Sequence, residues 1–183
     1  IMTNLFVTLF LIGFIVELRV FIKRKVFVDK KIDKGSMFLL LTAIGVNMFF
    51  IFLFPYLRIG QISSSISYFG FGVMITGFLL RQWSIQTLKK FFTPAVIIHQ
   101  DHKLVTSGPY KYIRHPSYMG LLLELAGAAL ATANLLSFFL IVVTLIPCLF
   151  YRIYIEETAL LKKFKSLYLI YRRQTKSLIP FIG

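Results

Sequence analysis

The sequence predicts an all-α integral membrane protein with about five transmembrane helices, including a helical hairpin formed by spans four and five, and a cytoplasmic amphipathic helix near its C-terminal end. Two observations predict this class. Of the 183 residues, 57% are hydrophobic, which would leave large apolar patches on a soluble domain. The formal net charge is +14, and many lysines and arginines flank apolar runs, where anionic lipid headgroups attract them. The lipid bilayer, and no nucleic acid, is therefore the expected partner of the basic residues.

The region 1–80 is predicted to hold three membrane spans. A spanning helix needs about 20 mostly apolar residues, and the stretches 1–22, 36–57 and 59–80 meet this requirement. The first stretch lacks the basic start and the small-residue cleavage pattern of a signal peptide. We therefore expect it to be a retained span.

The region 81–183 is predicted to hold a helical hairpin and the functional groups. The apolar block 117–151 carries Glu124 as its only charge and is too long for one ordinary span. Ala133 and Asn134 lie near its middle, so we expect a tight turn there between the fourth and fifth spans. Glu124 lies one to two turns into the fourth span, where a carboxyl group is costly unless it is paired or protonated.

Positive charge predicts the orientation of the chain. Lysines and arginines concentrate in 23–34, in 81–114 and in 152–176, and few occur in the other two loops. Five spans place these three segments on one side, the cytoplasm, and the N-terminus outside. An amphipathic helix at the membrane surface is expected in the tail, where apolar residues recur at helical spacing. These residues are Leu160, Leu161, Phe164, Leu167, Tyr168 and Tyr171.

A polar cluster precedes the fourth span. Pro116 suits the first turn of a helix, and His115 before it is biased away from helical geometry. Arg114 and His115 are thus expected at a helix N-terminus, whose unpaired amides favour an anion. The alternative is that these residues and the nearby tyrosines form only an interfacial belt, in which such side chains are ordinary.

A second cluster follows the fifth span. Arg152 and Glu156 are four residues apart and share one face of a helix, and Glu157 comes next. A surface ion pair is the simplest interpretation. These are, however, the only carboxylates after Glu124, and they lie in a strongly basic segment. An acidic pair in this position is suited to binding a cationic group.

The two clusters carry a resemblance to the isoprenylcysteine carboxyl methyltransferase family, within a wider group that includes phospholipid methyltransferases. The resemblance covers about residues 81 to 180, whereas the first two spans match only in hydropathy. The motifs that carry it are Arg81-Gln82-Trp83, Thr87-Leu88, Phe91-Phe92-Thr93, His102-Lys103-Leu104-Val105, Gly108-Pro109-Tyr110, Arg114-His115-Pro116-Ser117-Tyr118, Gly120, Tyr151-Arg152-Ile153, Glu156-Glu157, Leu160, Phe164, Tyr168, Tyr171 and Ile179-Pro180.

The resemblance implies a site as well as a fold. Membrane spans would surround a pocket for S-adenosylmethionine that C-terminal polar segments close, and a lipophilic substrate would enter from the bilayer. Arg152 and Glu156 match catalytic positions, and Arg152 also matches a substrate-binding position. Glu124 could line the substrate tunnel, or it could pair with a polar group of a neighbouring span. The residues that match cofactor contacts are His102, Lys103, Leu104, Val105, Tyr110, His115, Pro116, Ser117, Tyr118 and Glu156.

The reaction that follows is methylation of an isoprenylcysteine or similar prenylated acid. Methyl transfer from a sulfonium is a direct displacement, and a carboxylate acceptor is already ionised at neutral pH. Catalysis then depends on positioning and on exclusion of water. No metal is expected, since no ligand cluster completes the pair His99 and His102. Arg152 is expected to hold the substrate carboxylate through paired hydrogen bonds.

Three other functions stay open at this stage. A phospholipid N-methyltransferase, acting on phosphatidylethanolamine, would need an acid–base residue, for which Glu124 or His115 could serve. A nicotinamide-dependent membrane reductase need not carry a glycine-rich dinucleotide fingerprint. A non-catalytic membrane protein is disfavoured by the concentration of polar motifs on one side. Neither the methyl acceptor nor the oligomeric state follows from the sequence.

Overall fold

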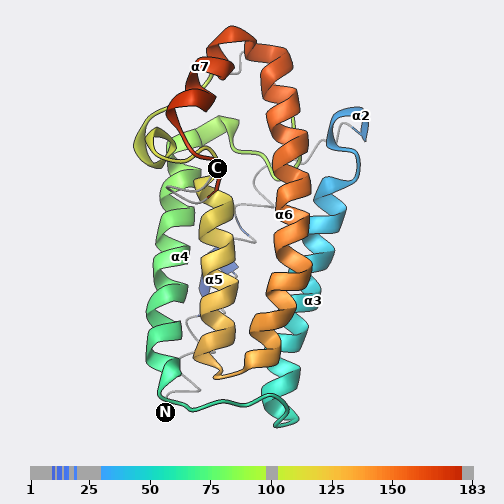
Figure 1. Cartoon of the computed structure of the whole chain (residues 1–183), viewed down its shortest axis with the longest axis vertical. Helices are drawn as coiled ribbons and strands as arrows, with labels where there is room; N and C mark the ends of the chain where they lie inside the picture. Colours follow the sequence, from blue (N-terminus) through green and yellow to red (C-terminus); the bar gives the residue numbers. More distant parts are fainter. Residues whose placement is uncertain are drawn as a thin grey trace.

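The computed structural model describes residues 10, 12–13, 15–16, 19, 30–97 and 103–178, and the described part is helical (Figure 1). It contains no strand, only two isolated bridges between single residues. The predicted all-α class is therefore confirmed for these residues. The helices are α2 (Lys30–Asp33), α3 (Ser36–Tyr56), α4 (Ile66–Leu88), η1 (Lys89–Phe91), η2 (Gly108–Lys111), α5 (Pro116–Ala131), α6 (Leu135–Phe164) and α7 (Ser166–Gln174).

Two of the described helices, α3 and α6, are long and apolar enough to cross a membrane. Helix α5 is apolar but shorter. Most of the predicted first span, 1–22, lies outside the described residues, so the count of five spans stays a prediction. The third predicted span, 59–80, was placed too early: a turn containing Gly60, at φ 70°, delays the start of α4 to residue 66.

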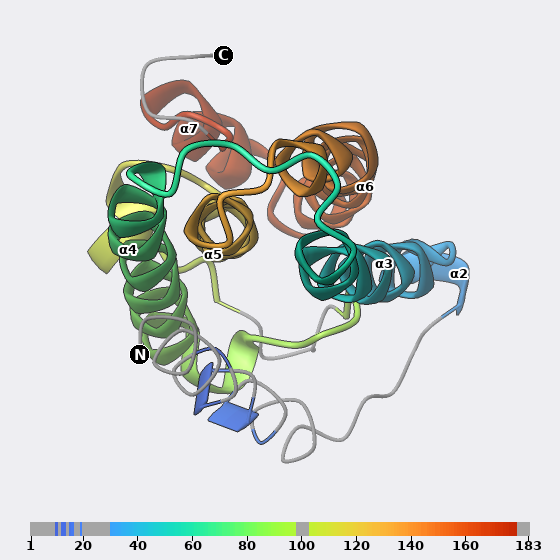
Figure 2. The same cartoon turned by 90° about the horizontal axis from the view of Figure 1, so that it is seen from below.

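The long helices stand side by side in the order α4, α5, α6, α3 (Figures 1 and 2). The turn between α5 and α6 falls at 132–134, where the sequence predicts it. Asn134 caps α6 by accepting a hydrogen bond from the Ser137 amide at 2.8 Å, and its side-chain amide donates to the Ile59 carbonyl at 2.7 Å. One asparagine thus starts α6 and ties the loop between α3 and α4 to it.

Helices α4 and α5 approach each other closely because each carries two glycines seven residues apart. These are Gly70 and Gly77 on α4, and Gly120 and Gly127 on α5. A Cβ atom at any of them would clash with backbone atoms of the opposite helix. Small residues that bring backbones together are the usual packing device between membrane helices, where lipid removes the hydrophobic drive for association.

A buried polar link joins α3 to α6 halfway along the bundle. The side-chain amide of Asn47 donates to the hydroxyl of Thr144 at 2.7 Å and to the Ala43 carbonyl at 2.8 Å. Asn47 is 1% exposed. The link stabilises the α3–α6 pair, and neither of its two residues lines the cavities described below.

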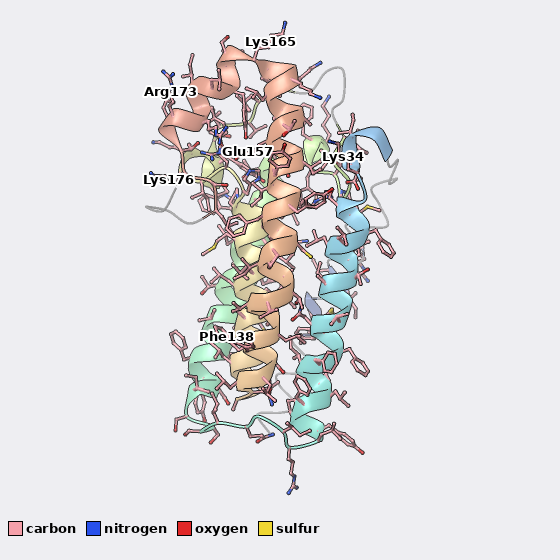
Figure 3. All side chains as sticks on the ribbon, turned by 45° about the vertical axis from the view of Figure 1, so that its right-hand side comes forward. Lys34, Phe138, Glu157, Lys165, Arg173 and Lys176 are labelled. Carbon is pink, nitrogen blue, oxygen red and sulfur yellow. The ribbon has the colours of Figure 1, made fainter. Side chains whose placement is uncertain are left out.

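The described basic segments share one end of the bundle. Figure 3 places Lys34, Lys165, Arg173 and Lys176 at this end and Phe138 toward the other. Helix α6 continues past the bundle here, and α7 folds back from its end (Figure 1). On α7, Tyr168 and Tyr171 are buried against the body, but Leu167 is 62% exposed and so is not part of the packed stripe.

Candidate functional site

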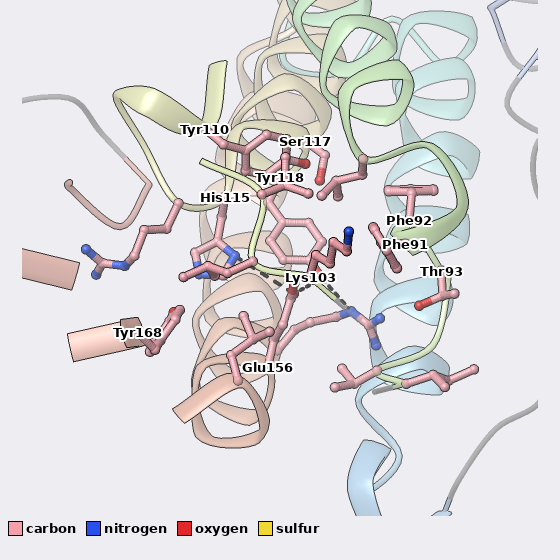
Figure 4. Close-up of a pocket in the computed structure, with 18 of the residues that line it drawn as sticks. Phe91, Phe92, Thr93, Lys103, Tyr110, His115, Ser117, Tyr118, Glu156 and Tyr168 are labelled. Atoms are coloured by element: carbon pink, nitrogen blue, oxygen red, sulfur yellow. Dashed lines mark hydrogen bonds and ion pairs between the residues drawn. The ribbon is translucent and has the colours of Figure 1, made fainter. Parts of the chain in front are cut away.

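Two cavities meet at the basic end of the bundle. The polar cavity, of about 80 Å³, lies among η2, the start of α5, α6 and α7 (Figure 4). The apolar cavity, of about 470 Å³, lies among α3, α4, α5 and α6. Four residues line both cavities and thus form a shared wall: Phe92, Thr93, Tyr118 and Arg152.

The polar cavity contains most of the residues that the sequence marked. Nine of the predicted site residues line it: Lys103, Leu104, Val105, Tyr110, His115, Ser117, Tyr118, Arg152 and Glu156. Pro116 begins α5 beside them without lining the cavity, and Glu124 lines the apolar cavity. His102 lies outside the described residues.

The turn that presents His115 is held by the segment after α7. The amides of Arg114 and His115 donate to the carbonyls of Lys176 (2.8 Å) and Ser177 (3.1 Å). The Arg114 guanidinium also donates to the carbonyls of Arg172 and Thr175. His115 itself has non-helical backbone geometry before Pro116, as predicted. The tail thus fixes the start of α5 through main-chain contacts.

Glu157 supports this turn from α6. It accepts a hydrogen bond from Arg114 Nε at 2.8 Å and lies 3.1 Å from His115 Nε2 and 3.6 Å from Arg172 Nε. Glu157 does not line the polar cavity. Its role in the described structure is therefore to hold Arg114 and His115 in place.

Glu156 is the carboxylate that reaches the polar cavity. It accepts a hydrogen bond from the Tyr118 hydroxyl at 2.7 Å, and its side chain is 30% exposed. The His115 ring stacks on the Tyr118 ring with centroids 5.6 Å apart. In Figure 4 these three side chains face Phe91, Phe92 and Thr93 across the cavity.

Arg152 is 2% exposed and already has internal partners. Nε donates to the Tyr118 hydroxyl (3.0 Å), Nη1 donates to Asp33 Oδ1 (3.0 Å) and to Ser36 Oγ (2.9 Å), and Nη2 donates to the Pro94 carbonyl. Four of the five N–H groups of the guanidinium are thus used. One Nη2 N–H has no partner among the described residues, which is too few for the predicted paired hydrogen bonds to a substrate.

Asp33 is the site residue that the sequence prediction missed. Burial alone would raise the pKa of its carboxyl, but the amides of Met37 and Val96, the charge of Arg152 and the Ser36 hydroxyl together lower the pKa below its ordinary value. The carboxylate is therefore ionised at neutral pH. The sequence pattern Asp-Lys-Gly-Ser before an apolar run indicates a helix cap, but nothing in it indicates an ion pair with residue 152.

The polar cavity also contains the buried hydroxyl group of Tyr168. Tyr168 from α7 lines the cavity, is 1% exposed and has no hydrogen-bond partner among the described residues. Burial, with the charges of Glu157 and Glu156, raises the pKa of Tyr168, so the hydroxyl keeps its proton. Together with the Glu156 carboxylate, this hydroxyl gives the cavity one hydrogen-bond donor and one acidic group.

Comparison with known proteins identifies relatives of the chain. It is 35% identical over 120 residues to protein-S-isoprenylcysteine O-methyltransferase B of Arabidopsis thaliana, covering 64% of this chain and 61% of that protein. It is 38% identical over 121 residues to the protein-S-isoprenylcysteine O-methyltransferase of Tribolium castaneum, covering 64% of this chain and 42% of that protein. The chain thus spans about three fifths of the length of the first relative and about two fifths of the length of the second.

A solved structure and a family model agree with these relatives. The structure of a eukaryotic intramembrane Ras methyltransferase, an isoprenylcysteine carboxyl methyltransferase, superposes with a TM-score of 0.61 and 31% identity, over 78% of this chain and 52% of that one. The model of the isoprenylcysteine carboxyl methyltransferase family matches residues 70–162, from α4 through most of α6. Since this match takes in half of the sequence and the residues of the shared wall, the chain belongs to the isoprenylcysteine carboxyl methyltransferase family.

Proposed function

We propose that this chain is an integral membrane enzyme that transfers a methyl group from S-adenosylmethionine to the carboxylate of a lipophilic acid, such as a prenylated cysteine. The observation that carries the proposal is the shared wall: a polar cavity with a carboxylate and an apolar cavity meet at Tyr118 and Arg152. A charged donor and a lipophilic acceptor could approach each other only at such a boundary. Family membership supports the same reaction.

The polar cavity is the proposed donor site. When bound, S-adenosylmethionine supplies a methyl group on a sulfonium, which leaves by direct displacement. Glu156 would hold a cationic group, Tyr168 would donate its free hydroxyl, and the segment 103–105 with the start of α5 would enclose the rest. Ligand pockets of this kind measure about 300 Å³ or more. The polar cavity is smaller, so donor binding must widen it.

The apolar cavity is the proposed acceptor site. Its volume suits a prenyl-sized chain, and its lining includes the apolar side chains Leu40, Ile44 and Met48 of α3. A carboxylate acceptor needs no general base. The side chains of the shared wall therefore need only to exclude water and orient the acceptor, and the remaining Nη2 N–H of Arg152 would contribute to that orientation.

The proposed orientation places the polar cavity near the cytoplasm. Lys34, Lys165, Arg173 and Lys176 lie at the end of the bundle that holds the polar cavity (Figure 3), and an excess of positive charge is typical of the cytoplasmic side of membrane proteins. Five spans, an N-terminus outside and α7 at the cytoplasmic surface complete the proposed topology. Labelling of single cysteines at Lys34 and at the exposed Ser64, in a Cys148→Ser background and in sealed vesicles, tests it: Lys34→Cys should react from the cytoplasmic side only, and Ser64→Cys from the other side only.

The decisive experiment uses the full chain in detergent with methyl-labelled S-adenosylmethionine. Binding of the donor, with label transfer to farnesylated cysteine and not to phosphatidylethanolamine, is the expected result. Transfer to phosphatidylethanolamine instead would identify a phospholipid N-methyltransferase. Failure to bind the donor at all would exclude both, and leave a reductase or a non-catalytic protein.

A further inference from the structure

Asp33 is a buried carboxylate that lies outside the segment matched by the family model. It ends α2, is 1% exposed, and accepts four hydrogen bonds from three parts of the chain. The donors are the Ser36 hydroxyl (3.1 Å), the Met37 amide (3.0 Å), the Val96 amide (3.1 Å) and Arg152 Nη1 (3.0 Å). Asp33 therefore joins the start of α3, the segment after η1 and the middle of α6 at one point.

The contact limits the freedom of the guanidinium of Arg152. Asp33 and Ser36 accept both hydrogens of Nη1, Tyr118 accepts that of Nε, and the Pro94 carbonyl accepts one of Nη2. A planar guanidinium held on three nitrogens cannot rotate about its stem. Its one remaining N–H therefore has a fixed direction at the shared wall between the cavities.

We propose that Asp33 is a positioning residue for methyl transfer: its carboxylate holds the Arg152 guanidinium so that a single N–H is presented to the acceptor. The inference rests on the proposed function and deepens it. It extends the site beyond the family-matched residues to the corner between α2 and α3. Because Nη1 of Arg152 stays hydrogen-bonded to Asp33, the acceptor carboxylate receives only one hydrogen bond from Arg152.

The competing explanation is that Asp33 only fastens α3 to α6. The chain offers a matched control for this explanation, since Asn47 and Thr144 make another buried polar link between the same helices. That link lines neither cavity. A variant that breaks it should loosen the α3–α6 pair without moving Arg152.

The test compares Asp33→Asn with Thr144→Val in the full chain, purified in detergent. Asparagine keeps the size of the side chain and one acceptor oxygen, which replaces only one of the two oxygens that accept from the Met37 and Val96 amides, and it loses the charge that holds Arg152. We expect kcat to fall about 10- to 100-fold in Asp33→Asn, since a displacement of about 1 Å at a reacting group can have this effect. The dissociation constant of S-adenosylmethionine should stay within about threefold, and Thr144→Val should keep its kcat within about twofold.

A second variant covers the case in which Asp33→Asn does not fold. Ser36→Ala removes one acceptor from Nη1 and leaves all charges in place. We expect a smaller fall of kcat, about three- to tenfold, because Asp33 still holds Nη1 when this one hydrogen bond is lost, again with donor affinity retained. Asp33→Glu should recover part of the activity lost in Asp33→Asn.

Two results would overturn the inference while the proposed function stands. One is an active wild type whose kcat survives both Asp33→Asn and Ser36→Ala. The other is an equal loss of kcat in Thr144→Val, which would make Asp33 a structural tether only. A wild type that binds the donor but methylates no acceptor would instead refute the proposed function, and this inference with it.

Discussion

The two cavities are built by different means. The polar cavity is assembled from side chains that hydrogen bonds and ion pairs hold, such as Glu157 with Arg114 and His115. The apolar cavity is a space between packed helices, and its lining is mostly aliphatic and aromatic. Affinity on the polar side therefore depends on individual atoms, whereas on the apolar side it depends on size and shape. The following substitutions test that contrast.

The largest effect is expected where both cavities share a side chain. Arg152→Ala leaves Asp33 buried without its cation, which typically costs about 3–5 kcal/mol of unfolding free energy. Turnover should be lost, while the folded fraction still binds S-adenosylmethionine. Chemical denaturation in detergent and donor binding measure the two effects. Combining Arg152→Leu with Asp33→Asn should recover the stability without the turnover; recovery of turnover would refute the assignment of Arg152.

A large effect confined to the polar cavity is expected for Glu156→Gln. The amide keeps the size of the side chain and an acceptor for Tyr118 but loses the negative charge. Hydrogen bonds to charged groups contribute about 1.5–3 kcal/mol, so the donor dissociation constant should rise about 10- to 100-fold in a calorimetric titration. The KM of the acceptor should change little. A normal donor affinity would contradict the placement of the donor in this cavity.

An intermediate effect is expected from filling the apolar cavity. Leu41 lines it and is half exposed, so Leu41→Trp can add volume without displacing the core. We expect the acceptor KM to rise about tenfold, the effect of a modest steric change on a hydrophobic pocket, with donor affinity unchanged. The control is Leu39→Trp, on the same helix but outside the cavity lining. Equal kinetics for the two variants would place the acceptor elsewhere.

The smallest effect is expected at the unpaired hydroxyl of Tyr168. Tyr168→Phe removes a buried polar atom that has no partner in the described structure, so the ligand-free protein should gain about 1 kcal/mol of stability. The donor should bind about threefold to tenfold more weakly if that hydroxyl contacts it. Thermal unfolding with and without donor separates the two. A loss of stability in the ligand-free protein would show that the hydroxyl is satisfied.

Local patterns predicted the elements that depend on neighbours in sequence. Pro116 after His115 predicted the start of α5, and Ala133 with Asn134 predicted the hairpin turn, because prolines and capping side chains act within a few residues. The start of α4 was missed because hydropathy continues through the turn at Gly60. Periodicity in the tail also joined Leu160 and Tyr171 in one amphipathic helix, whereas the chain turns at Lys165, at φ 48°, between α6 and α7.

The sequence by itself determined that this chain is helical, apolar and basic, and which residues carry the family motif, because composition and short motifs need no coordinates. The tertiary structure alone decided that Asp33 lies against Arg152, 119 positions away, and that four residues separate two cavities. The physical reason is that a buried ion pair depends on which helices pack together. No local preference of either residue encodes that choice.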